Sequence, residues 1–240
     1  MNVYLNKITG IEDAIISMYL SKRTWTKELN DRIISVCEDN LTLDGFLVRH
    51  PSKEMLDYLK MILKYGYEHK HTTLLRFIDL SFVVENIHRA GQDDWDSHAK
   101  RMDNRIVRAS TRLATFSDGE KSDYYKDKIL YPFEMLDILG IELPNNVFVG
   151  KDMYVKTDFG YIIDSLQKDK DAKRGLYPEA IPSTFIFKVQ YPELCHIIQH
   201  RDINSTANEE VKQLAEKIKL LVARALNQEF ADVLTKLKME

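Results

Sequence analysis

Between residues 183 and 211 the spacing of apolar positions changes from every second residue to every third or fourth. Phe185, Phe187 and Val189 fall on one face of an extended segment and Lys188 and Gln190 on the other, and this period of two predicts a strand with one buried face. The following apolar positions recur at helical spacing, and an arginine stands where the stripe should continue: Leu194, Ile197, Ile198 and then Arg201. The pattern therefore predicts a strand that leads directly into a helix.

The helix has a suitable start, and a further helix is expected after it. Pro192 fits a first helical turn, where its missing N–H is not needed. Residues 202–205 break the helix, and the pattern Thr206-x-x-Glu209 is a capping box that predicts the start of the next one. From Val211 to Ala225 runs the longest apolar stripe in the chain, which predicts a long helix packed on the core.

The rest of the chain gives weaker periodicities, and they predict elements of both kinds. In chain order these are a strand over residues 2–8, a helix after Gly10, a helical stretch at 32–37, a helix from Pro51 that stops at Gly66, a charged loop at 118–128, a helix at 131–139 that ends at Gly140, an irregular excursion at 143–156, a helix at 161–170 and a tail at 230–237. No repeat, low-complexity run or linker interrupts them, so residues 1–240 are predicted to form a single domain.

Composition narrows the classes of function. The 240 residues are 44% hydrophobic and 30% charged, as in ordinary globular proteins, and the net charge of −3 gives no sign of a nucleic-acid or membrane partner. Binding of a single anion depends on local charge and stays open. Cys37 and Cys195 provide no disulfide framework, which favours a reducing, cytoplasmic setting. We find no signal peptide and no apolar run of ~20 residues.

Common motifs for nucleotide binding, hydrolysis and metal binding are absent. The chain has no G-x-G-x-x-G, no G-x-x-x-x-G-K-[ST] and no G-x-S-x-G. His196 and His200 are four residues apart, and further ligands would have to come from Asp93, Asp94, Asp96 or His98. We favour a solvated acidic turn over a metal site there, because no spacing of the structural-zinc type is present.

The strand and helix described first resemble the C-terminal part of the flavin-dependent thymidylate synthases. In that family a strand ends in a polar residue, and the helix after it carries a His or Asn and then an Arg. Gln190, His196 and Arg201 occupy these positions without a gap. Three positions differ from the family. Gln190 replaces its usual Asn, Pro192 replaces a usual Arg, and Ser205 replaces a His that often follows the second Arg.

Two other segments are similar to the same family. A helix, a short loop and a strand follow one another around residues 66–84, and the loop holds His69, His71, Thr72 and Thr73, where the family contacts its flavin. Arg174-Gly-Leu-Tyr-Pro178 resembles the family's Arg-x-x-Leu-Pro motif, whose Arg contacts the nucleotide.

The family's central signature is present only in part. It is an Arg-His-Arg group followed by Ser, Asn-Glu, Ser and Arg-Tyr. In the matching segment, KRMDNRIVRASTRLATF, Ser110 and Arg112 match the last Ser and Arg, and Arg101 with its preceding lysine approximates the first basic pair. Met102 replaces the second Arg, and Leu113 replaces the Tyr. Residues 91–97, GQDDWDS, look like a short insertion ahead of the signature.

The resemblance implies an α+β fold, with a central, mostly antiparallel sheet flanked by helices, and a homotetramer whose sites combine several subunits. It implies FAD as cofactor, NADPH and methylenetetrahydrofolate as co-substrates, and methylation of dUMP to dTMP. The implied roles are catalysis and substrate binding for Arg201, substrate binding for Ser110, Arg112 and Arg174, and flavin binding for His69, His71, Thr72, Arg101, Gln190 and His196. No residue is assigned to a metal.

Two rival interpretations stay open. The chain can be a flavin enzyme that acts on another pyrimidine nucleotide, or a non-catalytic homologue that serves binding or assembly. Taken without the family, Arg201 on a mostly apolar helix face is a salt-bridged or snorkelling residue.

Overall fold

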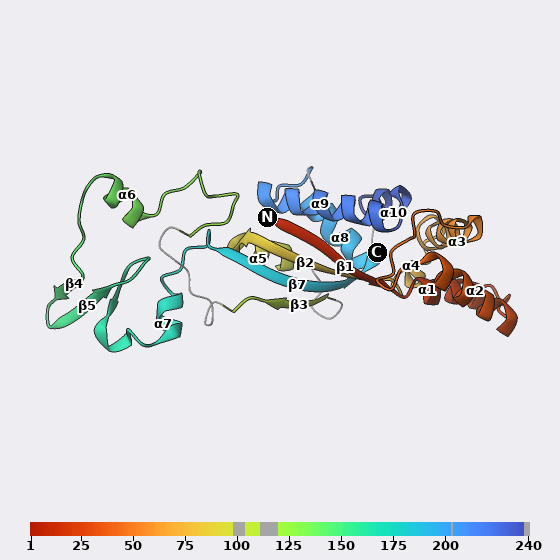
Figure 1. Ribbon diagram of the computed structural model, residues 1–240, viewed down its shortest axis with the longest axis horizontal. Coiled ribbons are helices and arrows are strands. Elements are labelled where there is room, and N and C mark those ends of the chain that lie inside the picture. The colour runs from red at the N-terminus through yellow and green to blue at the C-terminus, as the bar shows by residue number, and fades with distance from the viewer. Residues whose placement is uncertain (98–103, 111–119, 203, 238–240) are drawn as a thin grey trace. The chain divides into compact units, whose positions relative to one another are not determined.

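The computed structural model describes residues 1–97, 104–110, 120–202 and 204–237 (Figure 1). The chain forms two compact units. We call residues 2–84, 93–107 and 186–240 the major unit, and residue 1 with residues 85–92 and 108–185 the minor unit. Each unit is described by itself below.

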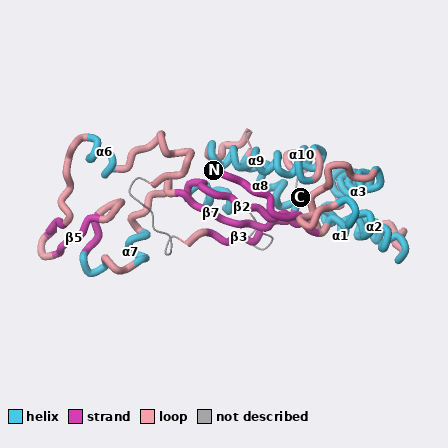
Figure 2. The backbone as a smooth tube through the Cα atoms, in the orientation of Figure 1, coloured by secondary structure: helices cyan, strands magenta, loops and turns pink. Residues whose placement is uncertain are grey.

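The described residues alternate between helices and strands (Figure 2). In chain order the elements are β1 (Asn2–Thr9), α1 (Ile11–Ser21), α2 (Lys27–Asn40), α3 (Lys53–Leu63), the π-helix η1 (Lys64–Glu68), α4 (Thr72–Leu75), β2 (Asp79–His88), α5 (Arg89–Ser97), β3 (Asn104–Arg108), α6 (Pro132–Ile138), β4 (Asn146–Val149), β5 (Asp152–Lys156), β6 (Tyr161–Ile163), the 3₁₀ helix η2 (Asp164–Leu166), α7 (Lys170–Arg174), β7 (Pro182–Gln190), α8 (Tyr191–Arg201), α9 (Glu209–Ala225) and α10 (Gln228–Val233). A four-stranded sheet has the order β1-β2-β7-β3, and a three-stranded sheet has the order β4-β5-β6. The α+β class predicted from the sequence is confirmed.

The core of the major unit is built where β7 passes into α8, as the apolar periodicity predicted. Phe82 stacks on Phe187 with ring centroids 5.1 Å apart, and Trp95 meets the same ring edge-on at 5.7 Å. Helix α9 packs along β1 (Figure 1). The predicted capping box is wrong by two residues: Asn208 caps α9 and accepts a hydrogen bond from the amide of Glu210.

The N-terminal helices of the major unit pack on one another through the predicted apolar face of α1. Ile11, Ala14, Ile15 and Met18 are all buried. The predicted stop at Gly66 is wrong, because α3 passes into the π-helix η1, in which the amide of His69 donates to the carbonyl of Lys64. Gly66 is buried there, and a Cβ on it would lie 2.5 Å from Leu75 Cγ.

The minor unit corrects two sequence predictions. Residues 143–156 are not irregular, since β4 and β5 pair antiparallel around a turn in which Gly150 has a φ of 65°. Residues 161–170 are not a helix: Tyr161–Ile163 pairs antiparallel with β5, and the pairing of these apolar and aromatic residues outweighs a short helical pattern.

The acidic stretch at residues 91–97 also differs from its prediction. It lies in helix α5 rather than in a solvated turn. Trp95 is buried within it, so a large aromatic anchor overrides the polarity of its neighbours. No helix in the described parts of the chain has the length and apolar character required to cross a membrane.

Candidate functional site

Arg201 lies in the last turn of α8, and its side chain is only 8% exposed. Its Nη2 donates to Asp94 Oδ1 at 2.6 Å and to the Asp94 carbonyl at 3.0 Å. Nη2 also reaches Ser97 Oγ at 3.3 Å, and Nη1 donates to the His200 carbonyl at 3.2 Å. Burial lowers the pKa of the guanidinium, and the Asp94 carboxylate opposes that change. The guanidinium is therefore charged and held in one orientation.

Helix α5 presents to this arginine a partner that sequence reasoning missed. Asp94 was interpreted as part of a solvated acidic run, but its carboxylate and its carbonyl both accept hydrogen bonds from Arg201. The signal in the sequence is Trp95, an aromatic residue within the acidic run, whose burial turns the neighbouring carboxylate toward α8.

Gln190 and His196 come from the junction of β7 and α8. Gln190 is half-buried and is the N-cap residue of α8. The next residue, Tyr191, donates its amide to the carbonyl of Ile78 at 2.8 Å, which ties the start of α8 to the segment ahead of β2. His196 is half-buried, and its ring lies 4.5 Å from that of His200. Both candidate flavin contacts are therefore partly exposed residues on a well-anchored element.

The loop with His69, His71 and Thr72 follows the π-helix. Both histidines are exposed, and Thr72 is half-buried at the start of α4. Helix α4 packs against α8. Within the major unit, the structure thus places the predicted flavin-contact loop on a neighbour of the helix that carries His196 and Arg201.

Ser110 and Arg174, the described candidates for phosphate binding, belong to the minor unit. Ser110 is exposed two residues after β3, and Arg174 is exposed at the end of α7. Arg101 and Arg112 lie outside the described residues. The predicted convergence of Ser110 and Arg112 on one anion therefore stays a prediction.

A pocket of about 500 Å³ lies next to Arg174 in the sequence and was not anticipated from it. Three cations line it, together with two aromatic rings and a single carboxylate: Lys156, Lys168, Lys173, Phe159, Tyr177 and Asp158. The rings of Phe159 and Tyr177 meet edge-on at 5.5 Å. Three ammonium groups against one carboxylate favour the binding of an anion. Sequence reasoning missed the pocket because its lysines lie on different elements.

Other polar atoms bear on metal and cofactor binding. Within the described ranges, no group of three or more His, Cys, Asp or Glu side chains is arranged to hold a metal ion. The buried indole Nε1 of Trp95, one residue from the ion pair, has no hydrogen-bond partner among the described residues. A buried donor of this kind is rare in folded proteins.

Comparison with known families decides the relationship. The sequence matches the family described as thymidylate synthase complementing protein over residues 44–226. The chain belongs to this family. All the predicted site residues lie inside the matched range, whereas residues 1–43 lie outside it. No curated protein matched the sequence.

Solved structures of similar fold come from the flavin-dependent thymidylate synthases and a related methylase. Thymidylate synthase X from Helicobacter pylori with FAD and dUMP has a TM-score of 0.58 and 13% identity, over 98% of this chain and 100% of that one. A second structure of that Helicobacter pylori enzyme with FAD and dUMP gives 0.57 and 13%, over 92% and 93%. The UMP/dUMP methylase PolB from Streptomyces cacaoi, bound with 5-Br dUMP, gives 0.53 and 11%, over 97% and 93%. At these identities the likeness establishes the fold.

Proposed function

We propose that this chain is a flavin-dependent thymidylate synthase that methylates dUMP to dTMP, with FAD as cofactor and with NADPH and methylenetetrahydrofolate as co-substrates. The observation that carries the proposal is the family match over residues 44–226, which contains every predicted site residue. The proposal includes a cytoplasmic location and a homotetrameric assembly.

The accessible groups of the major unit are suited to holding the flavin. His69, His71, Thr72, Gln190 and His196 would bind it, together with Arg101. A bound, reduced flavin supplies the hydride, so the chain needs no nucleophile of its own. The protein's part is to position the rings and to keep their polar edges hydrogen-bonded.

The cationic groups are suited to the nucleotide. Ser110, Arg112 and Arg174 would bind its phosphate, because a hydroxyl and guanidinium forks donate to several phosphate oxygens at once. Arg201, charged and oriented by Asp94, would donate to a pyrimidine carbonyl and stabilise the negative charge that develops on the ring.

A visible absorption spectrum of the purified protein tests the proposal first. It is repeated after incubation with excess FAD and gel filtration. We expect a flavin band that co-elutes with the protein and dTMP formation from dUMP when both co-substrates are supplied. Activity with UMP in place of dUMP would support a flavin enzyme on another pyrimidine nucleotide. The lack of a retained band would support the non-catalytic homologue.

Substitution of Arg201 tests the assignment of the catalytic group. Arg201→Ala should abolish dTMP formation while the oligomer elutes unchanged, whereas Arg201→Lys should keep the charge and lose the fork. Unchanged turnover in Arg201→Ala would refute the assignment.

A further inference from the structure

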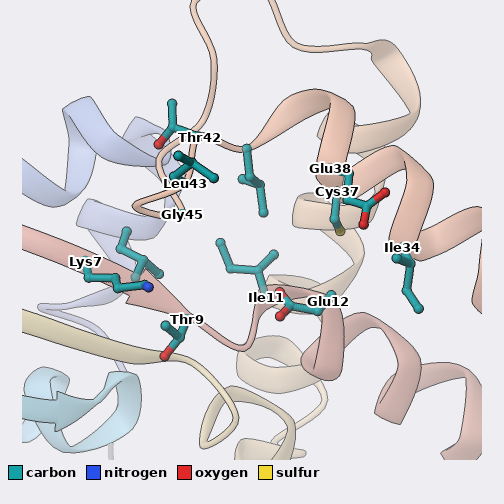
Figure 3. Close-up of a pocket in the computed structure, with 12 residues that line it drawn as sticks. Lys7, Thr9, Ile11, Glu12, Ile34, Cys37, Glu38, Thr42, Leu43 and Gly45 are labelled. Carbon is teal, nitrogen blue, oxygen red and sulfur yellow. The ribbon is translucent and has the colours of Figure 1, made fainter.

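A second pocket lies in the major unit, in the part of the chain that precedes the family match almost entirely. It has a volume of about 510 Å³ and is lined by residues of β1, α1, α2 and the loop after α2 (Figure 3). Pockets that hold small organic ligands have volumes of roughly 300–1,000 Å³. Of its lining residues only Gly45 falls within residues 44–226. Its chemistry therefore has to be inferred from its own side chains.

The walls of this pocket are fixed by backbone contacts. The amide of Ile8 donates to the carbonyl of Asp44 at 2.8 Å, and the amide of Thr42 donates to the carbonyl of Phe46 at 2.8 Å. Gly45 has a φ of 76°, and a Cβ on it would lie 2.0 Å from the carbonyl oxygen of Ile8. The loop is thus pinned to β1. A pre-formed pocket of this kind loses little conformational entropy when a ligand binds.

The lining combines an apolar wall with few charges. The apolar side chains are Ile8, Ile11, Ile34, Leu41 and Leu43. Leu43 is 98% exposed, so the apolar wall continues to the mouth of the pocket. An apolar ligand body placed there would remove this surface from water, at roughly 25 cal/mol per Å².

Two carboxylates face the same space. Glu12 comes from the first turn of α1 and Glu38 from the last turn of α2. Within the described part of the chain neither makes a hydrogen bond or an ion pair. Figure 3 shows both near Cys37, with Lys7 on the opposite side, on the strand. Burial, together with the fields of these two carboxylates, raises the pKa of the Cys37 thiol to about 12.

The end of α2 is electrostatically suited to a positive group. The C-terminus of a helix carries partial negative charge and favours basic side chains. The last turn of α2 holds Glu38 and Asp39 and no basic residue. A positive group beside Glu38 would relieve this repulsion.

We propose that this pocket binds a small organic cation with an apolar body. The ammonium group lies between the carboxylates of Glu12 and Glu38, and the hydrocarbon part covers Ile11, Ile34 and Leu41. Lys7, the cation among the lining residues, stands across the pocket from Glu38 and leaves that side negative. The pocket thereby selects an amine over an alcohol or a carboxylate of the same length.

Isothermal titration calorimetry on the full chain tests this selectivity with three probes of equal length at low salt: octylammonium, 1-octanol and octanoate. We expect saturable one-to-one binding of octylammonium, with octanol roughly tenfold weaker because it loses the charge interaction and octanoate weaker still. Equal binding of octylammonium and octanol, or no saturable binding of octylammonium, overturns the proposal.

Variants locate the site. Glu12→Gln with Glu38→Gln should weaken octylammonium binding at least about tenfold, while octanol binding stays the same. Asp39→Asn is the matched control, because Asp39 lies in the same turn but does not line the pocket; it should change the affinity less than about twofold. If the double variant fails to fold, Glu38→Gln alone serves, because Glu38 is exposed. If Asp39→Asn lowered the affinity for octylammonium as much as the double variant, general surface charge would explain the effect, and the proposed site would be refuted. None of these measurements depends on flavin or dUMP.

Discussion

The two units use the same backbone conformation in different ways. Gly10 and Gly45 in the major unit and Gly140 and Gly150 in the minor unit all have positive φ. A Cβ on Gly10 or Gly45 would lie 2.0 Å from a backbone carbonyl oxygen of another segment. A Cβ on Gly140 or Gly150 would meet nothing within 4 Å. In the major unit the glycine is required by a neighbouring chain segment, and in the minor unit by the turn alone.

Each unit has a buried, ion-paired cation: Arg201 pairs with Asp94 in the major unit, and Lys121 pairs with Glu134 in the minor unit. The minor unit in addition places Lys156, Lys168 and Lys173 around one pocket. Helix α6 buries none of its residues within the minor unit. The minor unit gathers three lysines around one pocket, while the pocket of the major unit is lined by two carboxylates and one lysine.

The largest contrast is expected at the glycines. Gly45→Ala should lower the free energy of unfolding by about 4 kcal/mol, because the strained φ and the clash with Ile8 both act on it. Gly150→Ala should lower it by about 1 kcal/mol, since only the φ acts. Urea denaturation measures both. If the two variants lost similar free energies of unfolding, the loop after α2 would be able to shift away from Ile8, and the two units would not differ in this respect.

The next largest effect concerns the ion pair of α5 and α8. Asp94→Ala should lower the free energy of unfolding by about 3 kcal/mol, because it leaves a buried guanidinium without its carboxylate. The double variant Asp94→Ala with Arg201→Ala should lose less than the sum of the two single variants. A double-variant cycle by urea denaturation gives the coupling. If the losses in the two single variants were additive, the interaction between Asp94 and Arg201 would contribute no coupling free energy.

Charge removal in the minor-unit pocket should act on binding rather than on stability. Lys173→Gln should weaken the binding of an anion to this pocket roughly tenfold, since one of three ammonium groups lining the pocket is lost. Lys170→Gln, on the same helix but outside the pocket, is the control and should bind as the unchanged chain does. Equilibrium dialysis at low and at high salt measures both. An equal effect of the two substitutions would point to a diffuse field instead of a pocket.

The smallest effect is expected from Cys37 at alkaline pH. Its pKa is raised to about 12, chiefly by burial, so the folded chain keeps the thiol proton that the unfolded chain loses from about pH 9. The contribution of this thiol to the free energy of unfolding is therefore fully present below about pH 9, and it is lost as the pH rises toward 12. Between pH 8 and pH 10 the loss should be about 1 kcal/mol after solvent screening. Cys37→Ala should flatten that decline in urea denaturation; an unchanged slope would contradict the assignment.

Sequence reasoning succeeded where one apolar face dominates an element. The strand at Phe187 and the helices at Ile15 and Val211 were placed correctly, because packing on one core enforces the period. It failed at residues 143–156 and 161–163, where short strands are defined by pairing with each other and not by a buried face.

The candidate site was predictable only in its chemistry. The family resemblance pointed to Arg201 as a site residue, and its place on an apolar stripe indicated only a salt-bridged or snorkelling side chain. The carboxylate that orients it lies 107 residues away along the chain, and no spacing indicates such a pair. The lysines of the minor-unit pocket are hidden for the same reason, since a β-strand, a loop and a helix bring them together. Their recognition requires the fold.

The π-helix after α3 has a consequence for evolution and engineering. A single π-turn holds one residue more than an α-helix of the same rise, and deletion of that residue restores the α-helical period. Removing one position from Lys64–Glu68 would therefore convert the wide turn into α-helix that continues α3, without turning the segment after it. His69 and His71 would keep their direction, although the helix before them had lost a residue. The π-helix is thus a place where the chain can change its length by one codon without redirecting the proposed flavin loop.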